Sequence, residues 1–433
     1  IYNKYIDELL RNEFQTSSPL LEDLFLRKDY ELLLKPVLDV IKKHPNASLT
    51  NLRLYLFQKS GLKEITDTFV KYTKTTPGLI LDFGTTKNRD TVLCGKRQEC
   101  VLKNGILIPD ELDIEQDTIF DIASTSKLFT SVAILRIYEL GYIDVFDPVN
   151  KYAPEFVNLD DVTIYDLLKF RVNIGTDKRI DSAKTKEEAE AILFSTHKRE
   201  GLLTNAYTDI GAMILRYVVE KATGVSFVEF VNSEIFKKAN MIDTYLNVPS
   251  EKLDRVANEN YSSIVKSDGT IITRNDNIPG TVHDAKALAI GHEFGIAPGH
   301  AGFFSTKNDL INFANALIKG KIISNDLVLT MSDTACGVEL DDNQYTYYYG
   351  SLVYLKQPDS SHLSVYYPLS GKAFMSPGFA GTTLVIDPIN QISVFIGANR
   401  LHNRIYQIHS SQLDKITVHE HNEETFMLPD GTE

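Results

Sequence analysis

The sequence of 433 residues has no tryptophan, only three cysteines and no long run of apolar residues. Cys94, Cys100 and Cys336 are an odd number, so they predict no disulfide framework, and their spacing is not that of a zinc site. Without about 20 continuous apolar residues, no membrane-spanning helix is expected. The excess of 58 acidic over 45 basic residues gives a net charge of −13, which argues against nucleic acid as the main partner.

The pattern of apolar residues predicts an α+β protein. Two short apolar runs joined by a polar turn predict an antiparallel hairpin over 77–97. Helical periodicity is expected over 64–72, 124–140, 163–168, 205–223, 227–236 and 309–317. Strands are expected over 345–354, 362–367, 382–387 and 392–398.

These elements predict an antiparallel β-sheet flanked by helices, built from 77–97 and 345–400, together with an all-α lobe over about 125–320. This domain would span residues 63–415, and 416–433 would form a tail. Residues 1–62 have a helical rhythm and would form a helical extension. That extension either packs on the main domain or serves as a partner-binding or substrate-gating module.

Ser124 and Lys127 lie three residues apart at the expected start of an amphipathic helix. Residues i and i+3 share one face of a helix, so the lysine amine can lie beside the serine hydroxyl. The backbone N–H groups of the helix terminus favour negative charge on that oxygen. The pattern alone is weak, because Ser-x-x-Lys also occurs at Ser60/Lys63, Ser195/Lys198 and Ser263/Lys266. Only the Ser124 copy opens a long apolar helix, which makes Ser124 the candidate activated serine.

Three motifs occur in a fixed order along the chain. They are Ser124-Thr125-Ser126-Lys127, Tyr207-Thr208-Asp209 and Ser376-Pro377-Gly378, with supporting matches at 147–156, 220–224 and 299–306. Together they resemble the serine β-lactamase and penicillin-binding-protein-like superfamily over about residues 63–410. The likeness is greatest to the branch that holds class C β-lactamases, D-alanyl-D-alanine carboxypeptidases and esterases.

The resemblance implies a serine hydrolase in which Ser124 attacks an acyl carbonyl and forms an acyl-enzyme. Lys127 or Tyr207 would act as the general base, and the choice stays open because two coupled groups titrate as a pair. The backbone N–H groups of Ser124 and Phe379 would form the oxyanion hole. The substrate pocket would include Asp209, Ser376, Pro377 and Gly378.

Two positions depart from the family pattern. Asp209 replaces the usual Asn, and its charge would either keep Lys127 protonated and favour Tyr207 as the base, or serve to cap a helix. Ser376-Pro377 replaces the usual Lys-Thr or His-Thr, so the side chain that helps to recognise a substrate carboxylate is missing. Arg400 and Lys372 are nearby in sequence and are candidate substitutes.

We therefore expect hydrolysis of small ester, amide or D-amino-acid peptide substrates, with a lean towards an esterase or transacylase. A D-alanyl-D-alanine carboxypeptidase or β-lactamase is the alternative, and a catalytically weakened binding or regulatory protein is a further one. A Ser-His-Asp triad built from His283, Asp284 or His300 is disfavoured, because His300 lies in a glycine-rich loop and no Gly-x-Ser-x-Gly motif accompanies it.

The expected partner is a small-molecule or peptidoglycan-like substrate, and neither a cofactor nor a metal is expected. The oligomeric state stays open. The resemblance favours an extracytoplasmic or secreted protein, with a cytoplasmic location as the alternative.

Overall fold

The computed structural model describes residues 62–104, 106–200, 207–274, 278–333, 339–340, 344–345, 348–356, 365, 369–409, 411–412, 417–421 and 423–427. The chain divides into two compact units, residues 1–65 and 66–433. Of the predicted helical extension over 1–62, the structure describes only Leu62, the first residue of α5 (Leu62–Asp67). The second unit carries the sheet, the helical lobe and all the candidate site residues.

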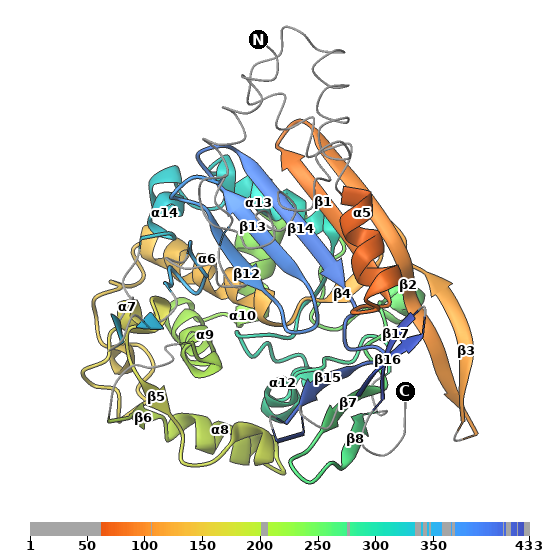
Figure 1. Cartoon of the computed structure of the whole chain (residues 1–433). Coiled ribbons are helices and arrows are strands. Elements are labelled where there is room, and N and C mark those ends of the chain that lie inside the picture. Colours follow the sequence, from red (N-terminus) through yellow and green to blue (C-terminus); the bar gives the residue numbers. More distant parts are fainter. Residues whose placement is uncertain are drawn as a thin grey trace, which may run out of the picture. The chain divides into compact units, whose positions relative to one another are not determined.

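Six strands of the second unit form one antiparallel sheet in the order β12-β13-β14-β1-β2-β3 (Figure 1). They are β12 (Phe374–Pro377), β13 (Thr383–Asp387), β14 (Ile392–Ala398), β1 (Gly78–Thr85), β2 (Arg89–Lys103) and β3 (Ile106–Asp113). Strands from both ends of the unit lie side by side, with Leu79 opposite Ala398. The predicted hairpin and the strands over 382–387 and 392–398 are confirmed, whereas β3 was not predicted.

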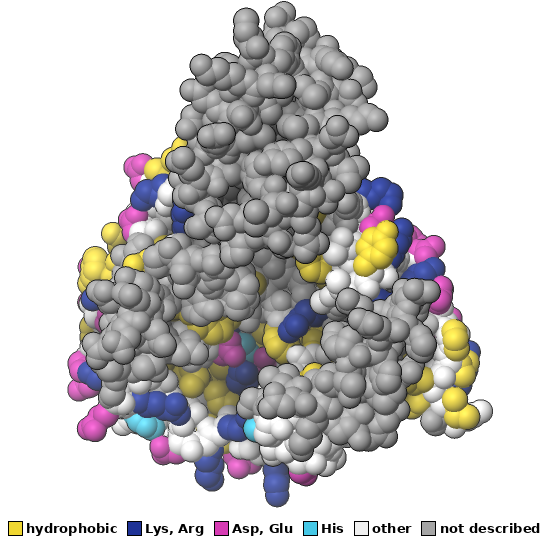
Figure 2. Space-filling model, in the orientation of Figure 1, with side chains coloured by type: hydrophobic (Ala, Val, Ile, Leu, Met, Phe, Trp, Pro, Cys, Tyr) yellow, Lys and Arg dark blue, Asp and Glu magenta, His cyan; other side chains and the backbone are white. Residues whose placement is uncertain are grey.

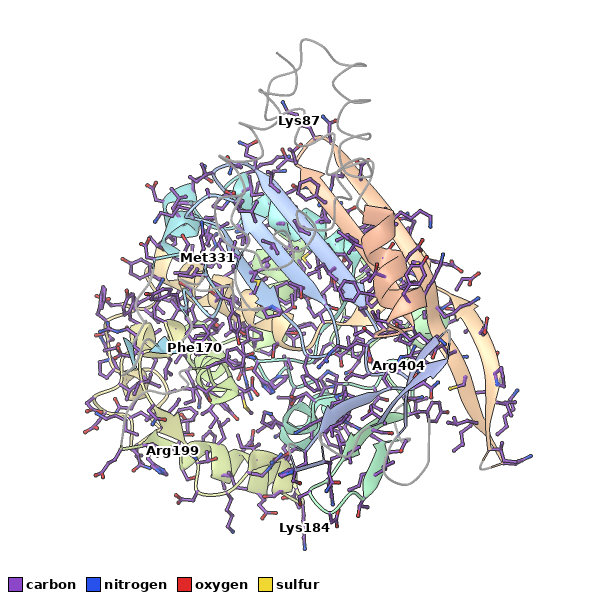
Figure 3. The ribbon with its side chains drawn as sticks, viewed as in Figure 1. Lys87, Phe170, Lys184, Arg199, Met331 and Arg404 are labelled. Carbon is purple, nitrogen blue, oxygen red and sulfur yellow. The ribbon has the colours of Figure 1, made fainter. Side chains whose placement is uncertain are left out.

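The helices form the predicted lobe and cover the sheet. They are α6 (Lys127–Glu139), α7 (Ile164–Leu168), α8 (Lys186–Phe194), α9 (Asp209–Thr223), α10 (Phe227–Val231), α11 (Lys237–Ala239), α12 (Ala285–Ile290), α13 (Lys307–Ile318) and α14 (Asn325–Thr330). Helix α13 packs on β13 and β14, and α6 packs on α9. Figure 3 shows Phe170 and Met331 buried inside this lobe, while Lys87, Lys184 and Arg199 lie exposed at the margin of the unit.

Short pairings connect the remaining segments. β4 (Ile119–Asp121) pairs with β9 (Phe304–Thr306), and β5 (Ile174–Gly175) pairs with β6 (His197–Lys198). β7 (Ser262–Val265) lies between β8 (Ile271–Arg274) and β15 (Ile405–Ile408). In the predicted tail, β16 (Thr417–His421) pairs with β17 (Glu423–Met427). No helix among the described residues is long and apolar enough to span a membrane.

The strand predicted over 345–354 is wrong for the residues that the structure describes. Only the pair β10 (Glu339–Leu340) and β11 (Gln344–Tyr345) and isolated bridges at Tyr349 and Tyr354 occur there. The aromatic residues that suggested a strand instead enter the helical lobe, where the Tyr349 ring lies 5.0 Å from the Phe170 ring. Aromatic residues favour strands because of how their side chains pack, and here that packing is supplied by the rings of Phe170, Tyr207 and Tyr354, which lie outside helices and named strands. The strand predicted over 362–367 lies outside the described residues, except for Val365.

Helix α6 is buried around its whole circumference except near its C-terminal end, so the prediction that it is amphipathic is wrong. Ten of its thirteen side chains are buried. Its hydroxyl groups are satisfied by distant backbone oxygens, since Thr130 donates to Gly299 O at 2.5 Å and Ser131 to Ser351 O at 2.7 Å. The ring of Phe129 meets three other rings at 4.8 to 5.4 Å, those of Phe236, Phe303 and Phe313. The candidate nucleophile therefore lies at the start of a helix with little freedom to move.

Candidate active site

Ser124 lies on a short 3₁₀ helix, Ala123–Ser126, between strand β4 and helix α6. Side chains at i and i+3 eclipse each other in a 3₁₀ helix, which brings Lys127 over Ser124. Lys127 Nζ donates a hydrogen bond of 2.9 Å to Ser124 Oγ. Ser124 is partly exposed, whereas its neighbours Ala123 and Thr125 are buried. Ser124 is thus the one partly exposed residue of an otherwise buried 3₁₀ turn.

The residue before Ser124 has a left-handed backbone. Ala123 has φ +43°, a region that non-glycine residues seldom adopt. The buried carboxylate of Asp121 holds this turn, because its Oδ1 accepts a 2.8 Å hydrogen bond from Ala123 N and its Oδ2 a 2.9 Å bond from His283 N. Burial raises the pKa of Asp121 to about 6, although these two hydrogen bonds oppose the rise.

Lys127 is 1% exposed and donates to three acceptors. Besides Ser124, these are Asp209 Oδ1 at 2.7 Å and the backbone oxygen of His300 at 3.2 Å. Burial lowers the pKa of Lys127, but Asp209 and Tyr207 outweigh burial and the pKa lies above its ordinary value. Burial likewise raises the pKa of Asp209, and the neighbouring cations, Lys127 first, bring it below its ordinary value. The two groups therefore form an ion pair in which Lys127 is buried and Asp209 is partly buried.

Of the two roles predicted for Asp209, the structure assigns the helix cap to a different residue. Thr208 Oγ1 accepts the hydrogen bond from Ile210 N that caps α9, at 3.2 Å. Asp209 is the first residue of the helix, and both of its carboxylate oxygens face ammonium groups. Helix α9 ends as predicted, at Gly224 in the left-handed conformation.

Tyr207 forms one wall beside the lysine. Lys127 Nζ lies over its ring, 4.8 Å from the centroid. The ring packs against Phe170 at 5.3 Å and Tyr354 at 5.5 Å. These contacts fix a phenol next to the Ser124/Lys127 pair, and Tyr354 was not foreseen as part of this wall.

The backbone N–H groups of the two residues before Ser124 have hydrogen-bond acceptors, whereas the N–H of Ser124 itself has none among the described residues. Ile122 N donates to Phe303 O and Ala123 N to Asp121. Such unpaired donors are expected at the start of a helix. Phe379 N also lacks an acceptor within the described part of the chain. Both predicted oxyanion-hole donors are thus available to an anionic oxygen.

The third motif packs directly on the turn that carries Ser124. Thr125 Oγ1 donates to Ser376 O at 3.0 Å, and Ser376 Oγ donates to Ser124 O at 3.4 Å. Pro377 ends β12, and Gly378 opens a tight turn in which Gly381 N donates to Gly378 O at 3.0 Å. The Ser376 side chain is 3% exposed, so it supports the turn.

The two cations considered as substitutes for the missing Lys or His have different surroundings. Lys372 forms an ion pair with Asp333 at 2.6 Å. Arg400 Nε donates to Phe379 O at 2.6 Å, and its guanidinium lies 4.7 Å from the centre of the Phe379 ring. The two Nη groups of Arg400 have no hydrogen-bond partner among the described residues. The Phe379 side chain is 49% exposed.

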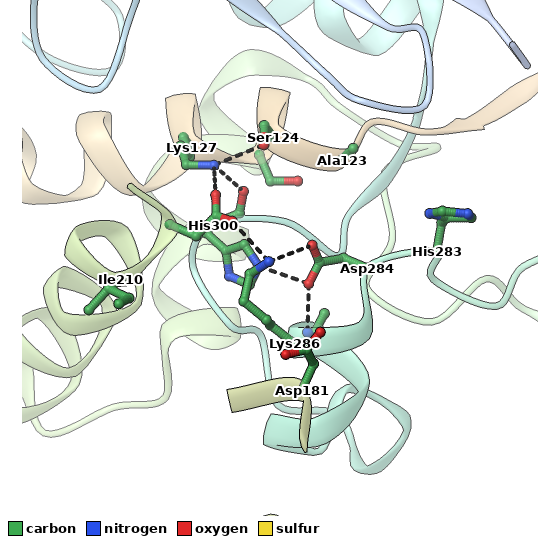
Figure 4. A network of polar contacts seen from close by, with 12 residues as sticks. Ala123, Ser124, Lys127, Asp181, Ile210, His283, Asp284, Lys286 and His300 are labelled. Atoms are coloured by element: carbon green, nitrogen blue, oxygen red, sulfur yellow. Dashed lines mark hydrogen bonds and ion pairs between the residues drawn. The ribbon is translucent and has the colours of Figure 1, made fainter. Parts of the chain in front are cut away.

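Sequence reasoning missed a second layer of charges behind Asp209. Lys286 Nζ lies 3.1 Å from Asp209 Oδ2, and His300 Nε2 lies 3.0 Å from Asp284 Oδ1 (Figure 4). Figure 2 shows a hollow on this face, with basic, acidic and histidine side chains at its floor. The imidazole of His300 pairs with Asp284 and contributes only its backbone oxygen to Lys127. No local sequence pattern marks Lys286 as part of the site.

The other described copies of Ser-x-x-Lys do not bring the two side chains together. Ser195 ends helix α8, and Lys198 pairs with Asp161. Ser263 lies on strand β7 and bonds Thr273, and residues i and i+3 point to opposite faces of a strand. Ser60 lies outside the described residues.

The antiparallel sheet covered by helices, with Ser-x-x-Lys opening a buried helix, agrees with the family model and the relatives reported below, which indicate a hydrolase of the β-lactamase and penicillin-binding-protein class. The chain belongs to the Beta-lactamase family, whose sequence model matches residues 105–414. This confirms the resemblance and the α+β fold class.

Individual relatives agree with this assignment. A protein of Salmonella typhi named "Putative D-alanyl-D-alanine carboxypeptidase" is 24% identical over 327 residues, which are 67% of this chain and 71% of the relative. A class C β-lactamase from Rhodobacter sphaeroides superposes with a TM-score of 0.56 at 14% identity, over 79% of this chain and 95% of the other. EstCE1, described as a hydrolase with promiscuous acyltransferase activity, has a TM-score of 0.55 at 16% identity, over 85% and 93%. At these identities the solved structures establish the shared fold.

Proposed function

We propose that the protein is a serine hydrolase that works through an acyl-Ser124 intermediate on small ester, amide or D-amino-acid peptide substrates. The observation that carries the proposal is the 2.9 Å hydrogen bond between Lys127 Nζ and Ser124 Oγ at the start of a buried helix. The unpaired N–H groups of Ser124 and Phe379 support an oxyanion hole, and such donors are worth roughly 3–4 kcal/mol each.

In the proposed reaction, Tyr207 is the general base. The ion pair with Asp209 favours the ammonium form of Lys127, which has no free electron pair to accept a proton. With Tyr207 in its phenolate form beside the Lys127 ammonium, Ser124 Oγ attacks the acyl carbon, its proton moves to the phenolate oxygen, and the carbonyl oxygen becomes the oxyanion. The proton then passes to the leaving group as its bond to carbon breaks. Water, activated by Tyr207, hydrolyses the acyl-enzyme by the same steps.

The lean towards an ester or acyl-transfer substrate rests on the third motif. Ser376 is buried, Pro377 has no charge, and Lys372 is paired with Asp333, so none of them is suited to bind a substrate carboxylate. The acyltransferase activity of EstCE1 is in line with this lean. A carboxypeptidase is the second candidate, because Arg400 has Nη groups without partners beside Phe379, and the Salmonella relative bears that name.

The test is covalent labelling with a fluorophosphonate probe, followed by turnover of p-nitrophenyl acetate, nitrocefin and a D-Ala-D-Ala peptide. Wild-type protein and Ser195→Ala should label and turn over, since Ser195 has the same motif without the contact. Ser124→Ala should lose both. Labelling that survives in Ser124→Ala contradicts the proposal, turnover of the peptide alone contradicts the ester lean, and no labelling of the wild type favours the weakened binding protein.

A further inference from the structure

Lys286 joins two carboxylates at the floor of the site. Its Nζ lies 3.1 Å from Asp209 Oδ2 and 3.6 Å from Asp284 Oδ2 (Figure 4). Asp284 is the N-cap of α12 and accepts a hydrogen bond of 2.8 Å from Ala287 N, which fixes its carboxylate. The ammonium thus lies between two negative groups that would otherwise repel each other.

Asp209 is consequently shared between two ammonium groups. Its Oδ1 accepts from Lys127 at 2.7 Å, and its Oδ2 lies 3.1 Å from Lys286. Two oxygens held by two cations from different elements leave the carboxylate little rotational freedom. The positive charge of Lys286 also offsets part of the negative potential that Asp209 exerts on Lys127 and Tyr207.

We propose that Lys286 is a positioning residue that holds Asp209 against Lys127 and sets how readily the Lys127–Tyr207 pair gives up a proton. The inference rests on the proposed function, in which this pair handles the proton of Ser124. Without Lys286, the full charge of Asp209 acts on the pair and favours its protonated form. The basic form that accepts the Ser124 proton is then populated only at higher pH.

The negative groups that face Lys286 act on the Lys127–Tyr207 pair in the direction opposite to the Lys286 ammonium. One of them, Asp284, therefore supplies a control variant. Asp284 contacts Lys286 directly, and Asp181, which forms an ion pair of 2.5 Å with Arg179, adds a further negative charge. The imidazole of His300 lies against Asp284. Replacing Asp284 by Asn removes one negative charge while keeping a side chain that caps helices well. The potential at the pair therefore becomes more positive, and its basic form extends to lower pH.

The experiment is the rate of fluorophosphonate labelling as a function of pH for the full chain and four variants. The acid limb is the pH range over which the labelling rate rises with increasing pH. For Lys286→Met it should move to higher pH by roughly one to two units, and for Asp284→Asn it should move to lower pH. Lys286→Arg should have the same acid limb as the wild type, because Arg retains the positive charge at this position. Lys198→Met, which removes an exposed lysine paired with Asp161, should leave the limb unchanged.

Shifts of the acid limb in opposite directions distinguish this role from structural damage. Damage would lower the labelling rate but would not move the limb in a direction set by the charge that was removed. The inference is overturned if the limbs of Lys286→Met and Asp284→Asn coincide with that of the wild type or move in the same direction. If Lys286→Met does not fold, as judged by circular dichroism, Lys286→Gln and Asp284→Asn carry the same comparison. A wild type that shows no Ser124-dependent labelling rejects the proposed function together with this inference, whereas unshifted limbs reject this inference alone.

Discussion

Asp209 accepts a hydrogen bond of 2.7 Å from Lys127, a lysine whose side chain is 1% exposed. Because Thr208 caps helix α9, the carboxylate of Asp209 is not needed for the capping hydrogen bond. It lies instead next to the candidate nucleophile as half of an ion pair, at a position where the family usually has a neutral amide. The charge at this position is therefore a feature of this chain that experiments can isolate.

Replacing Asp209 by Asn tests that charge. Asn retains an acceptor for Lys127 but removes the negative charge that raises its pKa, so the Lys127–Tyr207 pair should give up a proton more readily. We expect the acid limb of the labelling rate to move down by at least about one pH unit. Asp161→Asn, which removes a surface carboxylate paired with Lys198, is the control. An unshifted limb would show that the charge of Asp209 has no part in proton transfer.

Gly378→Ala should disrupt the turn that carries Phe379 N. A Cβ at this position would overlap the backbone oxygen of Ile122, in the segment that leads to Ser124. We expect a loss of about 1–3 kcal/mol in the free energy of unfolding and roughly a hundredfold lower acylation rate. Gly371→Ala is the matched control, since a Cβ there meets no atom within 4 Å. Thermal melts and labelling rates measure both effects, and a Gly378→Ala protein that labels at the wild-type rate would contradict the proposed oxyanion hole.

The buried carboxylate of Asp121 should make stability depend on pH. Its pKa is about 6 in the folded protein against an ordinary value of 3.8, so the folded state binds the proton more tightly than the unfolded state. The stabilisation from its protonated form is complete below pH 3.8 and is lost as pH rises through about 6. At about 1.4 kcal/mol per pKa unit, the change is roughly 3 kcal/mol.

Asp121→Asn should lack this contribution. Urea unfolding of the variant and the wild type between pH 4.5 and 7.5 should show the variant gaining stability relative to the wild type as pH rises, whatever their difference at the acidic end. Comparing the two proteins cancels the opposite contribution of Asp209 and Asp284, whose pKa values are lowered. Parallel pH profiles would contradict the prediction.

Arg400→Met should reveal what this guanidinium does beside Phe379. Loss of its 2.6 Å hydrogen bond to Phe379 O and of its contact with the ring should slow ester acylation by about tenfold. Arg400→Lys keeps a donor without the planar guanidinium, so an intermediate rate is expected.

The substrate panel then separates two roles of Arg400. If it only supports the turn, kcat/KM falls equally for p-nitrophenyl acetate and for a D-Ala-D-Ala peptide. If it binds a substrate carboxylate, the peptide loses much more than the ester. Unchanged kcat/KM for both substrates would exclude both roles.

Much of the fold follows from local signals in the sequence. The end of α9 at Gly224, the hairpin of β1 and β2 and the order of the three motifs depend on short-range periodicity and turn chemistry, and the structure has them where they were expected. The contact between Ser124 and Lys127 likewise depends on residues three apart. Signals of this range can be recognised without knowing the tertiary structure.

The features that were missed depend on contacts between segments far apart in the chain. Helix α6 was expected to have a polar face, but Thr130 and Ser131 find acceptors at Gly299 and Ser351. Lys286 becomes part of the site only because α12 is brought next to the start of α9. Neither relation leaves a pattern within one segment, since the partner of each side chain is set by packing.

The pairing of β1 with β14 has a consequence for synthesis on the ribosome. Residues 79–85 pair on one side with 392–398, which are translated long after them. Until that late segment emerges, one edge of β1 has no partner, and long-range pairings of this kind are slow to form. Phe379, the second proposed oxyanion donor, is likewise translated well after Ser124 and Lys127. A nascent chain that carries Ser124 and Lys127 but not yet these later residues would thus be inert, and acylation would mark only chains in which they have been made and have folded.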